Sequence, residues 1–137
     1  MHAVLLSHDQ HGANLDDAGR ALLPSAGVVL TTVSGARASA ATRGLAPWQD
    51  LRLAAAGRPD LRVTATPCRH GPPLSRPLAG AVTGFALRWP GQRHGALWIS
   101  GDTVLYGGVR AVARRLRVGT AVLHLGGVRF PVTGPVR

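Results

Sequence analysis

The stretch from Ala3 to Asp16 constrains the fold of this chain more than any other. An apolar run, Ala3 to Leu6, ends abruptly in His8, Asp9 and His11, and an amphipathic segment begins a few residues later. A buried strand followed by a polar loop and a helix explains this order of residue types. Imidazole nitrogens bind zinc at about 2.0–2.1 Å and need a rigid backbone behind them, so the end of a core strand suits them. The stretch therefore predicts a metal-binding loop at the end of a strand.

Helical and extended segments alternate along the rest of the chain. Asn14 is the expected N-cap of a helix with Asp16 and Asp17 in its first turn, where the helix dipole favours carboxylates. Val28 to Thr32 is a second buried strand. We then expect a weak helix over 34–42, strands over 50–54, 61–66, 82–89, 96–100 and 120–125, and a helix over 105–116. This alternation predicts a layered α/β sandwich.

Two later stretches place polar groups at the ends of predicted strands. Thr66 to Gly71 contains His70 and follows the strand over 61–66, and Ser100 to Thr103 contains Asp102 and follows the strand over 96–100. Several prolines stiffen the loop around His70, which we expect to form the wall of a substrate pocket.

Taken in order, these stretches resemble the motifs of the metallo-β-lactamase superfamily. The histidine-rich stretch after Leu6 looks like T/S-H-x-H-x-D-H, His70 like the third motif histidine, and Asp102 like the metal-bridging aspartate. With Val82 to Phe85 added, the resemblance is to the lactonase-like branch that includes ascorbate-6-phosphate lactonase. It implies an αββα sandwich, in which two mixed sheets lie between helices.

The chain departs from the family pattern in several places. His8 and His11 are separated by two residues where the family has one, and Ala13 and Asn14 stand where the family has aspartate and histidine. The family's last histidine would lie beyond Arg137. We therefore expect a single partial domain over residues 1–137, incomplete at both ends, with an exposed sheet edge that could drive self-association.

The resemblance implies that His8, His11 and His70 are ligands of a zinc ion, with iron or manganese as alternatives. Zinc held by three neutral imidazoles keeps an open position for water and lowers the pKa of that water to about 7. The hydroxide would attack the carbonyl or phosphorus atom of a small ester, lactone or phosphate-bearing substrate.

Two carboxylates are the candidates for proton transfer. Asp102 would bridge to a second metal or orient the attacking water. Because alanine cannot ligate a metal, Ala13 weakens the second metal site, and proton transfer falls to Asp102 or Asp9.

Three further residues are candidates near this site. Arg69 could pair with a substrate phosphate or carboxylate, although a surface position is the simpler explanation. His124 closes a strand at a similar level and could line the pocket, with a structural role as the alternative. Cys68 could bind metal or be oxidised, but its position favours a small buried filler.

The net charge of +10 comes from 16 arginines against 6 acidic residues. The arginines are scattered along the chain and lack interleaved aromatics, which argues for a solvated basic face over a nucleic-acid interface. A single cysteine excludes an internal disulfide and fits a reducing compartment. No apolar run approaches the roughly 18 residues of a membrane span, so we expect a cytoplasmic protein.

Three classes of function follow. The first is a zinc-dependent hydrolase of a small molecule. The second is a catalytically impaired fragment of the same fold that binds at most one metal, which Ala13, Asn14 and the missing last histidine favour. The third is a basic nucleic-acid-binding member of the superfamily.

Overall fold

The computed structural model describes residues 1–10, 12, 14–38, 41–73, 80–125, 128–130 and 134–136. Its elements, in chain order, are β1 (Ala3–Leu5), α1 (Asp17–Leu22), η1 (Leu23–Ser25), β2 (Val28–Thr32), η2 (Gly35–Ala38), β3 (Thr42–Leu45), β4 (Asp50–Leu53), β5 (Leu61–Pro67), β6 (Thr83–Arg88), β7 (Ala96–Ile99), α3 (Gly107–Arg115), β8 (Val118–Val122), β9 (Val128–Phe130) and β10 (Gly134–Val136). Among these elements, no helix is long and apolar enough to cross a membrane.

The described strands form two main sheets and one hairpin. The first sheet has the order β1-β2-β3 and is parallel throughout. The second has the order β4-β5-β6-β7-β8; its pairs are antiparallel except for the parallel pair of β7 and β8. Strands β9 and β10 pair only with each other.

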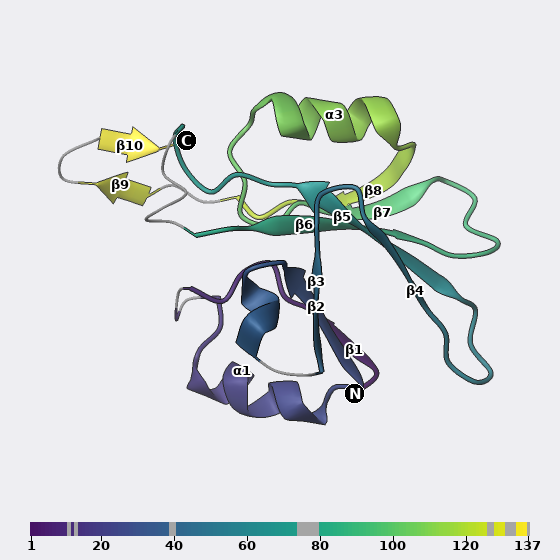
Figure 1. Cartoon of the computed structure of the whole chain (residues 1–137). Helices are drawn as coiled ribbons and strands as arrows, with labels where there is room; N and C mark the ends of the chain where they lie inside the picture. The colour runs from purple at the N-terminus through teal and green to yellow at the C-terminus, as the bar shows by residue number, and fades with distance from the viewer. Residues whose placement is uncertain are drawn as a thin grey trace.

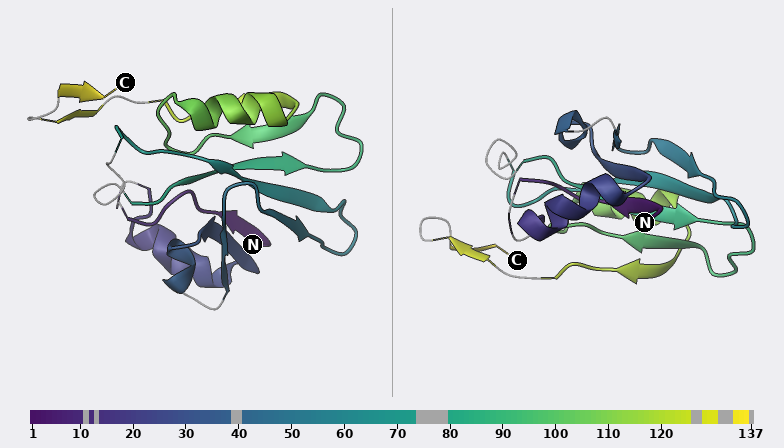
Figure 2. Two further views of the ribbon diagram at one scale, coloured as in Figure 1. Left: turned by 45° about the horizontal axis from the view of Figure 1, so that its top comes forward. Right: turned by 90° about the horizontal axis from the view of Figure 1, so that it is seen from below.

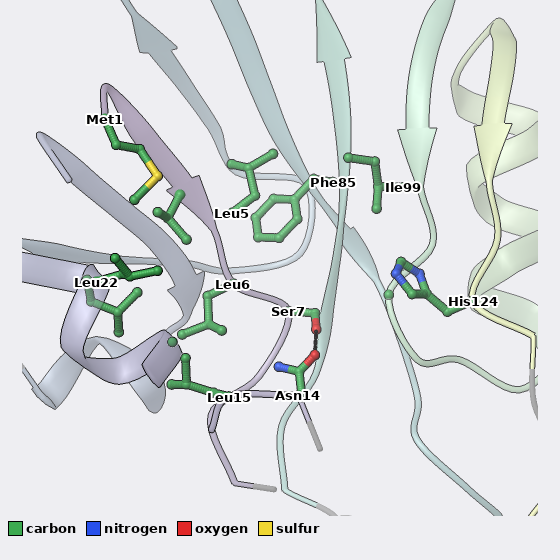
Figure 3. Close-up of a pocket in the computed structure, with 14 residues that line it drawn as sticks. Met1, Leu5, Leu6, Ser7, Asn14, Leu15, Leu22, Phe85, Ile99 and His124 are labelled. Carbon is green, nitrogen blue, oxygen red and sulfur yellow. Dashed lines mark hydrogen bonds between the residues drawn. The ribbon is translucent and has the colours of Figure 1, made fainter. Parts of the chain in front are cut away.

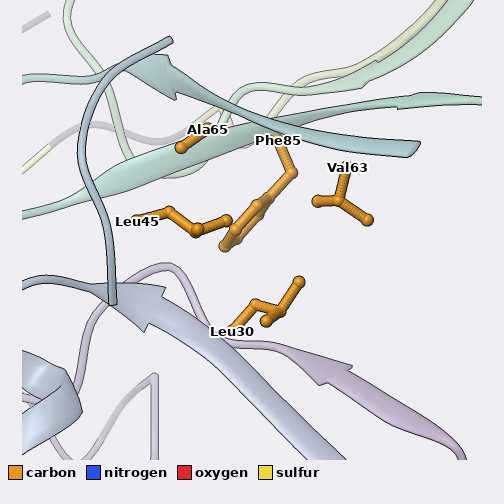
Figure 4. Packing of buried hydrophobic residues seen from close by; sticks show 5 residues of the cluster. All are labelled: Leu30, Leu45, Val63, Ala65 and Phe85. Atoms are coloured by element: carbon orange, nitrogen blue, oxygen red, sulfur yellow. The ribbon is translucent and has the colours of Figure 1, made fainter. Parts of the chain in front are cut away.

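The two sheets pack face to face through a shared apolar core (Figure 4). Leu30 and Leu45 come from the three-stranded sheet, and Val63, Ala65 and Phe85 from the five-stranded sheet. All five side chains are at most 4% exposed. Burying a side chain of this size stabilises a fold by about 1.5–3 kcal/mol, so this cluster holds the sheets together.

Helices cover the two outer faces (Figure 1). On one side, Leu15 and Leu23, at the two ends of the α1 segment, pack in a cluster with Leu6 and Val29. On the other side, α3 buries Val112 in a cluster whose further buried members are Ala86, Ala96 and Trp98. The layers run helix, sheet, sheet, helix, which confirms the αββα sandwich predicted from the sequence.

The start of α1 corrects one expectation. The N-cap is Asp16, whose Oδ1 accepts a hydrogen bond of 2.7 Å from the backbone N–H of Gly19, and not Asn14. Both residue types cap helices well, so local preference could not separate them. Asn14 is instead engaged by the loop that precedes the helix.

The segment after β2 also differs from the sequence-based expectation. The weak helix expected over 34–42 is only the 3₁₀ turn η2, and strand β3 was not expected at all. The residues of β3, Thr-Arg-Gly-Leu, carry no alternating apolar pattern, and their extended conformation comes from pairing with β2. Local sequence signals therefore do not predict this strand, because its pairing with β2 makes it extended.

The two sheets differ in width, and this leaves part of one face uncovered. The core between the sheets involves β4, β5 and β6, but no residue of β7 or β8. Both β1 and β8 are edge strands, and they lie toward the same side of the molecule (Figure 2, right). The three-stranded sheet therefore stops short of the inner faces of β7 and β8.

Candidate metal-binding site and adjoining cavity

The loop after β1 is anchored to both sheets. The backbone N–H of Leu6 donates to the carbonyl of Leu30 at 2.8 Å, and the carbonyl of Ser7 accepts from the N–H of Thr83 at 3.0 Å. These bonds fix the backbone on which His8 sits, and the His8 side chain is only 1% exposed. The rigid backbone that a metal-binding imidazole needs is thus present at this position.

Ser7 and Asn14 orient His8 from two sides. The Ser7 hydroxyl donates to Asn14 Oδ1 at 3.3 Å and lies 3.0 Å from His8 Nδ1. Because that hydroxyl has one proton, it accepts from His8 Nδ1–H when it donates to Asn14. The Asn14 amide also donates to the His8 carbonyl. This arrangement favours the tautomer whose Nε2 carries the lone pair that binds a metal.

His70 reaches the same place from the end of β5. Its imidazole and that of His8 have centroids 5.7 Å apart, with ring planes tilted by 34°. The preceding residues are bonded to the loop after β7: Arg69 N–H donates to Thr103 Oγ1 at 3.2 Å, and Cys68 Sγ donates to the Asp102 carbonyl at 3.2 Å. The fold thus brings together His8 and His70, which are the two predicted metal ligands among the described histidines.

The separation of these rings can be tested against a shared cation. A zinc–nitrogen bond of about 2.0–2.1 Å places each ring centroid about 3.2 Å from the metal, so two ligands at the tetrahedral angle have centroids about 5.2 Å apart, and about 6.4 Å is the limit for ligands on opposite sides of the ion. The observed 5.7 Å lies within this limit. The His8 and His70 rings therefore fit a common metal by distance.

The remaining predicted ligands do not complete the set in the part of the chain that the structure describes. His11 lies outside the described residues. Within them, no group of three or more histidine, cysteine, aspartate or glutamate side chains is arranged to hold a metal ion. Asp102 thus does not join His8 and His70 in such a group, and its role as a ligand stays a prediction.

Asp9 is next to His8 and has an unusual environment. Its carbonyl accepts a hydrogen bond of 2.8 Å from the Arg20 guanidinium. Its side-chain Oδ1 is buried and has no hydrogen-bond partner among the described residues. Buried carboxylate oxygens are almost always paired, so this one is suited to lie beside a cation.

Arg69 is held beside this site by stacking. Its guanidinium carbon lies 4.6 Å from the centre of the Tyr106 ring. None of the ion pairs formed between described residues involves Arg69, and its Nε is buried without a described hydrogen-bond partner. A fixed guanidinium of this kind can recognise a carboxylate or phosphate. The substrate-binding role of Arg69 stays a prediction.

Cys68 has the properties of a structural residue. Burial raises the pKa of its thiol to about 12, and the nearby Asp102 carboxylate acts in the same direction. A thiol with this pKa stays protonated at neutral pH, whereas metal binding and oxidation require the thiolate. The environment therefore favours the filler role.

A cavity of about 380 Å³ lies between the layers next to the Ser7 loop (Figure 3). Leu5, Phe85 and Ile99 form part of its apolar wall, while Ser7 and Asn14 lie at a polar end. This volume falls in the range of small-molecule sites, about 300–1,000 Å³.

His124 lies on the wall of the same cavity (Figure 3). Its backbone N–H donates to Ser100 Oγ at 3.2 Å, which fixes the chain just after β8. Whether the imidazole binds substrate stays a prediction.

Sequence reasoning missed the structural roles of Ser7 and Asn14. Ser7 fills the first position of the recognised motif, and this position was a usable signal. The sequence indicates only a helix cap and a poor metal ligand at Asn14. The bond from Asn14 to the His8 carbonyl could not be predicted, because it depends on how the loop folds back.

No protein-family model and no curated protein matches the chain. Among solved structures, it is similar to the isothiocyanate hydrolase from Delia radicum gut bacteria, with a TM-score of 0.75 and 20% identity over 98% of this chain and 54% of that chain. It is also similar to a possible metal-dependent hydrolase from Veillonella parvula, with a TM-score of 0.62 and 20% identity over 84% of this chain and 45% of that chain.

These likenesses show the fold, which is of the metallo-β-lactamase type. The chain spans about half the length of the two solved structures that it matches.

Proposed function

We propose that this chain forms the metal-binding part of a hydrolase that acts on a small ester, lactone or phosphate-bearing substrate. One observation carries the proposal: the imidazoles of His8 and His70 come from the ends of strands in different sheets and lie 5.7 Å apart, within reach of one cation. The likeness in fold to two structures described as hydrolases supports the reaction class. The lactonase-like branch remains part of the proposal and rests on the sequence motifs.

His8 and His70 would hold the metal, with His11 as the third ligand. Imidazole ligands suit zinc best, and iron or manganese less well. When bound, such a metal supplies Lewis acidity and lowers the pKa of a coordinated water to about 7.

The other residues of the site act on the substrate and its protons. Ser7 keeps His8 in the tautomer with a lone pair at Nε2. Asp9 and Asp102 are the candidates for proton transfer, and the buried Asp9 Oδ1 has no hydrogen-bond partner among the described residues. The stacked Arg69 guanidinium would bind an anionic group, and His124 would contact the part of the substrate that enters the cavity.

The proposal is tested by metal content and hydrolysis of the same preparations. The chain is purified after growth with zinc, iron or manganese, and bound metal is measured by mass spectrometry. We expect His8→Ala and His70→Ala to lose stoichiometric metal, because the remaining ligands cannot hold the ion. His94→Ala is the control, since His94 is exposed and lies in the turn between β6 and β7. Unchanged metal content in the His70 variant would overturn the ligand assignment.

Hydrolysis is then assayed on chromogenic esters, lactones and phosphate esters, with and without a chelator. Turnover that disappears with chelator and in the His70 variant supports the hydrolase. Metal binding without turnover above the solution rate would instead support the second class, an impaired member of the fold. Asn14 gives that alternative specific support, because where the family has a histidine this chain uses an amide to hold the His8 carbonyl.

A further inference from the structure

A second cavity, of about 300 Å³, lies between the β6–β7 hairpin and the end of α3. The hairpin lines it with Arg88, Trp89 and Gln92, and the end of the helix with Arg115, Leu116 and Arg117. The strands β5, β6 and β7 are antiparallel neighbours, so the end of β6 lies far along the sheet from the loops after β5 and β7. This cavity is therefore at the opposite end of the five-stranded sheet from the candidate metal site.

The cavity gathers three arginines from two separate segments of the chain. Arg88 ends β6, Arg115 ends α3, and Arg117 precedes β8. The structure describes all six acidic residues of the chain, and none of them lines this cavity. Among the ion pairs between described residues, none involves Arg115 or Arg117. A concave surface with charges of one sign repels cations and concentrates anions.

The charge of Arg88 is only partly compensated. Its Nη2 donates to Thr64 Oγ1 at 3.2 Å and lies 3.8 Å from Asp50 Oδ2, while its Nε is buried without a hydrogen-bond partner among the described residues. Asp50 is also shared, because the same Oδ2 lies 3.3 Å from Arg62 Nη1. One carboxylate thus serves two arginines, and a further anion in the cavity would balance the charge that remains.

A stacking contact holds Arg115 in place without a ligand. Its guanidinium carbon lies 4.6 Å from the centre of the Trp48 ring. Trp48 has a φ of 72°, and it alone among the described non-glycine residues has a positive φ, a conformation that is rare for a bulky side chain. A guanidinium that is already fixed loses less conformational entropy when it binds, so this contact favours binding at the cavity.

The cavity has room for more than a phosphate ion. Its volume is at the lower end of the range for small-molecule sites, about 300–1,000 Å³. Trp89 lines it and is 40% exposed, so an indole surface is available next to the arginines. Aromatic rings stack favourably on such a surface.

We propose that this cavity binds a small phosphate ester that carries an aromatic ring, with the phosphate against Arg88, Arg115 and Arg117 and the ring against Trp89. Guanidiniums pair with phosphate oxygens through two parallel hydrogen bonds. A phosphate monoester carries a charge of about −1.5 to −2 at pH 7, which suits three arginines better than the single charge of a carboxylate. This inference does not depend on the proposed hydrolase function.

The test is calorimetric titration of the purified chain at low salt with phenyl phosphate, inorganic phosphate and phenol. We expect phenyl phosphate to bind about fivefold or more tightly than inorganic phosphate, because only the ester has a ring to stack on Trp89. Phenol should not bind measurably, since it is uncharged at neutral pH.

Three substitutions separate the two parts of the cavity. Arg115→Gln and Arg117→Gln should each weaken the binding of phenyl phosphate about tenfold or more, because each removes a charged hydrogen-bond donor. Arg117 is exposed, so this variant tests the cavity even if loss of the stack on Trp48 unfolds the Arg115 variant. Trp89→Leu should lower the affinity for phenyl phosphate to that for inorganic phosphate, and leave the latter unchanged.

Arg114→Gln is the matched control for Arg115→Gln. Both arginines lie in the last turn of α3, where a positive charge also stabilises the helix dipole, but Arg114 does not line the cavity. Arg93→Gln is the corresponding control for Arg117→Gln, because Arg93 is exposed in the turn between β6 and β7 and does not line the cavity either. Both controls lower the net charge by one, as the test variants do, and should keep the parent affinity.

His70→Ala distinguishes this cavity from the candidate metal site. Unchanged binding of phenyl phosphate in that variant supports a separate site, whereas lost binding would assign the anion to the metal site and refute the proposal. Equal losses in all four arginine variants would show only attraction by the net charge of +10, and a lack of binding would have the same consequence. The proposal also fails if a short oligothymidylate binds through the same arginines far more tightly, since the cavity would then be part of a nucleic-acid surface.

Discussion

His8 follows a strand of the parallel sheet, and His70 follows a strand of the mixed sheet, yet their rings lie 5.7 Å apart. Neither sheet alone places two imidazoles together. The pair exists because Ser7, in the first loop, is hydrogen-bonded to Thr83 at the start of β6, and this bond joins the two sheets at the site. The candidate metal site is therefore a property of how the sheets pack.

Asn14→Ala should weaken the loop that carries His8. The variant loses the bond to the His8 carbonyl and the bond from the Ser7 hydroxyl. We expect the free energy of unfolding to fall by about 1 kcal/mol and metal affinity to fall about tenfold or more. Urea unfolding and metal titration measure the two effects. Asp16→Ala removes the α1 cap nearby and should lower stability without changing metal affinity.

Gly101→Ala should be more damaging than Gly57→Ala. The two glycines have nearly equal positive φ values, +64° and +69°, so both variants carry the strain of the left-handed region, about 1–2 kcal/mol. At Gly101 a Cβ would also lie 2.6 Å from the Thr83 carbonyl oxygen, whereas at Gly57 it would meet no atom within 4 Å. Equal losses in chemical denaturation would show that the loop after β7 can move away from β6.

Cys68 should react slowly while the protein is folded. With a pKa of about 12, its thiolate fraction at pH 8 is about a thousandfold below that of an ordinary thiol with a pKa of 9.0. Iodoacetamide labelling of the folded chain should be slower by a comparable factor than labelling in urea. Rapid labelling without denaturant would contradict the burial of this group.

The same raised pKa predicts a loss of stability at alkaline pH. Between about pH 9 and pH 12 the unfolded chain releases the Cys68 proton and the folded chain retains it, so unfolding becomes easier as pH rises. Below pH 9 this contribution is fully present. Burial also raises the pKa of Tyr106, which acts in the same direction. Cys68→Ala should therefore lose less stability than the parent chain between about pH 8 and about pH 10.5, as measured by urea midpoints.

Phe85→Ala should destabilise the sandwich by about 3–5 kcal/mol. Phe85 is 2% exposed and contacts the cluster that joins the sheets (Figure 4). A domain of this kind has only about 5–15 kcal/mol of net stability, so the thermal midpoint should fall markedly. Trp89→Ala is the comparison, because Trp89 is 40% exposed and its loss should cost much less. A small effect at Phe85 would mean that the sheets are held together elsewhere.

The sequence predicted most strands of the five-stranded sheet because their apolar residues cluster between clear turn signals. The turns Gly57-Arg58-Pro59 and Pro90-Gly91 separate β4 from β5 and β6 from β7 as expected. Strand β3 was missed because Arg43 and Gly44 have weak strand preference and are extended only through their pairing with β2. Local sequence signals predict a strand reliably where its own residues carry the apolar pattern and clear turns flank it. They fail where the segment is extended only because it pairs with a strand from elsewhere in the chain.

Some features of the candidate site could be predicted from the sequence, and others could not. The positions of His8 and His70 after strands could be read from the chain, and the structure brings these two together. The bond between Asn14 and the His8 carbonyl could not be read, since it depends on the path of a loop. The distance of Asp102 from the histidines could not be predicted from the sequence either. It depends on how the loops after β5 and β7 pack against each other.

The contrast between the two sheets implies an order of folding. Strands β4 to β7 are consecutive antiparallel neighbours, so each can pair with the next through a short local connection. The parallel strands β1, β2 and β3 need crossover connections, and closing these costs chain entropy before any pairing rewards it. We expect hydrogen exchange during refolding to protect β5 and β6 before β1. Metal binding by His8 and His70 would then begin only when the three-stranded sheet packs on the five-stranded sheet. A folding intermediate that forms before this step would contain the hairpins of the five-stranded sheet but would not bind the metal.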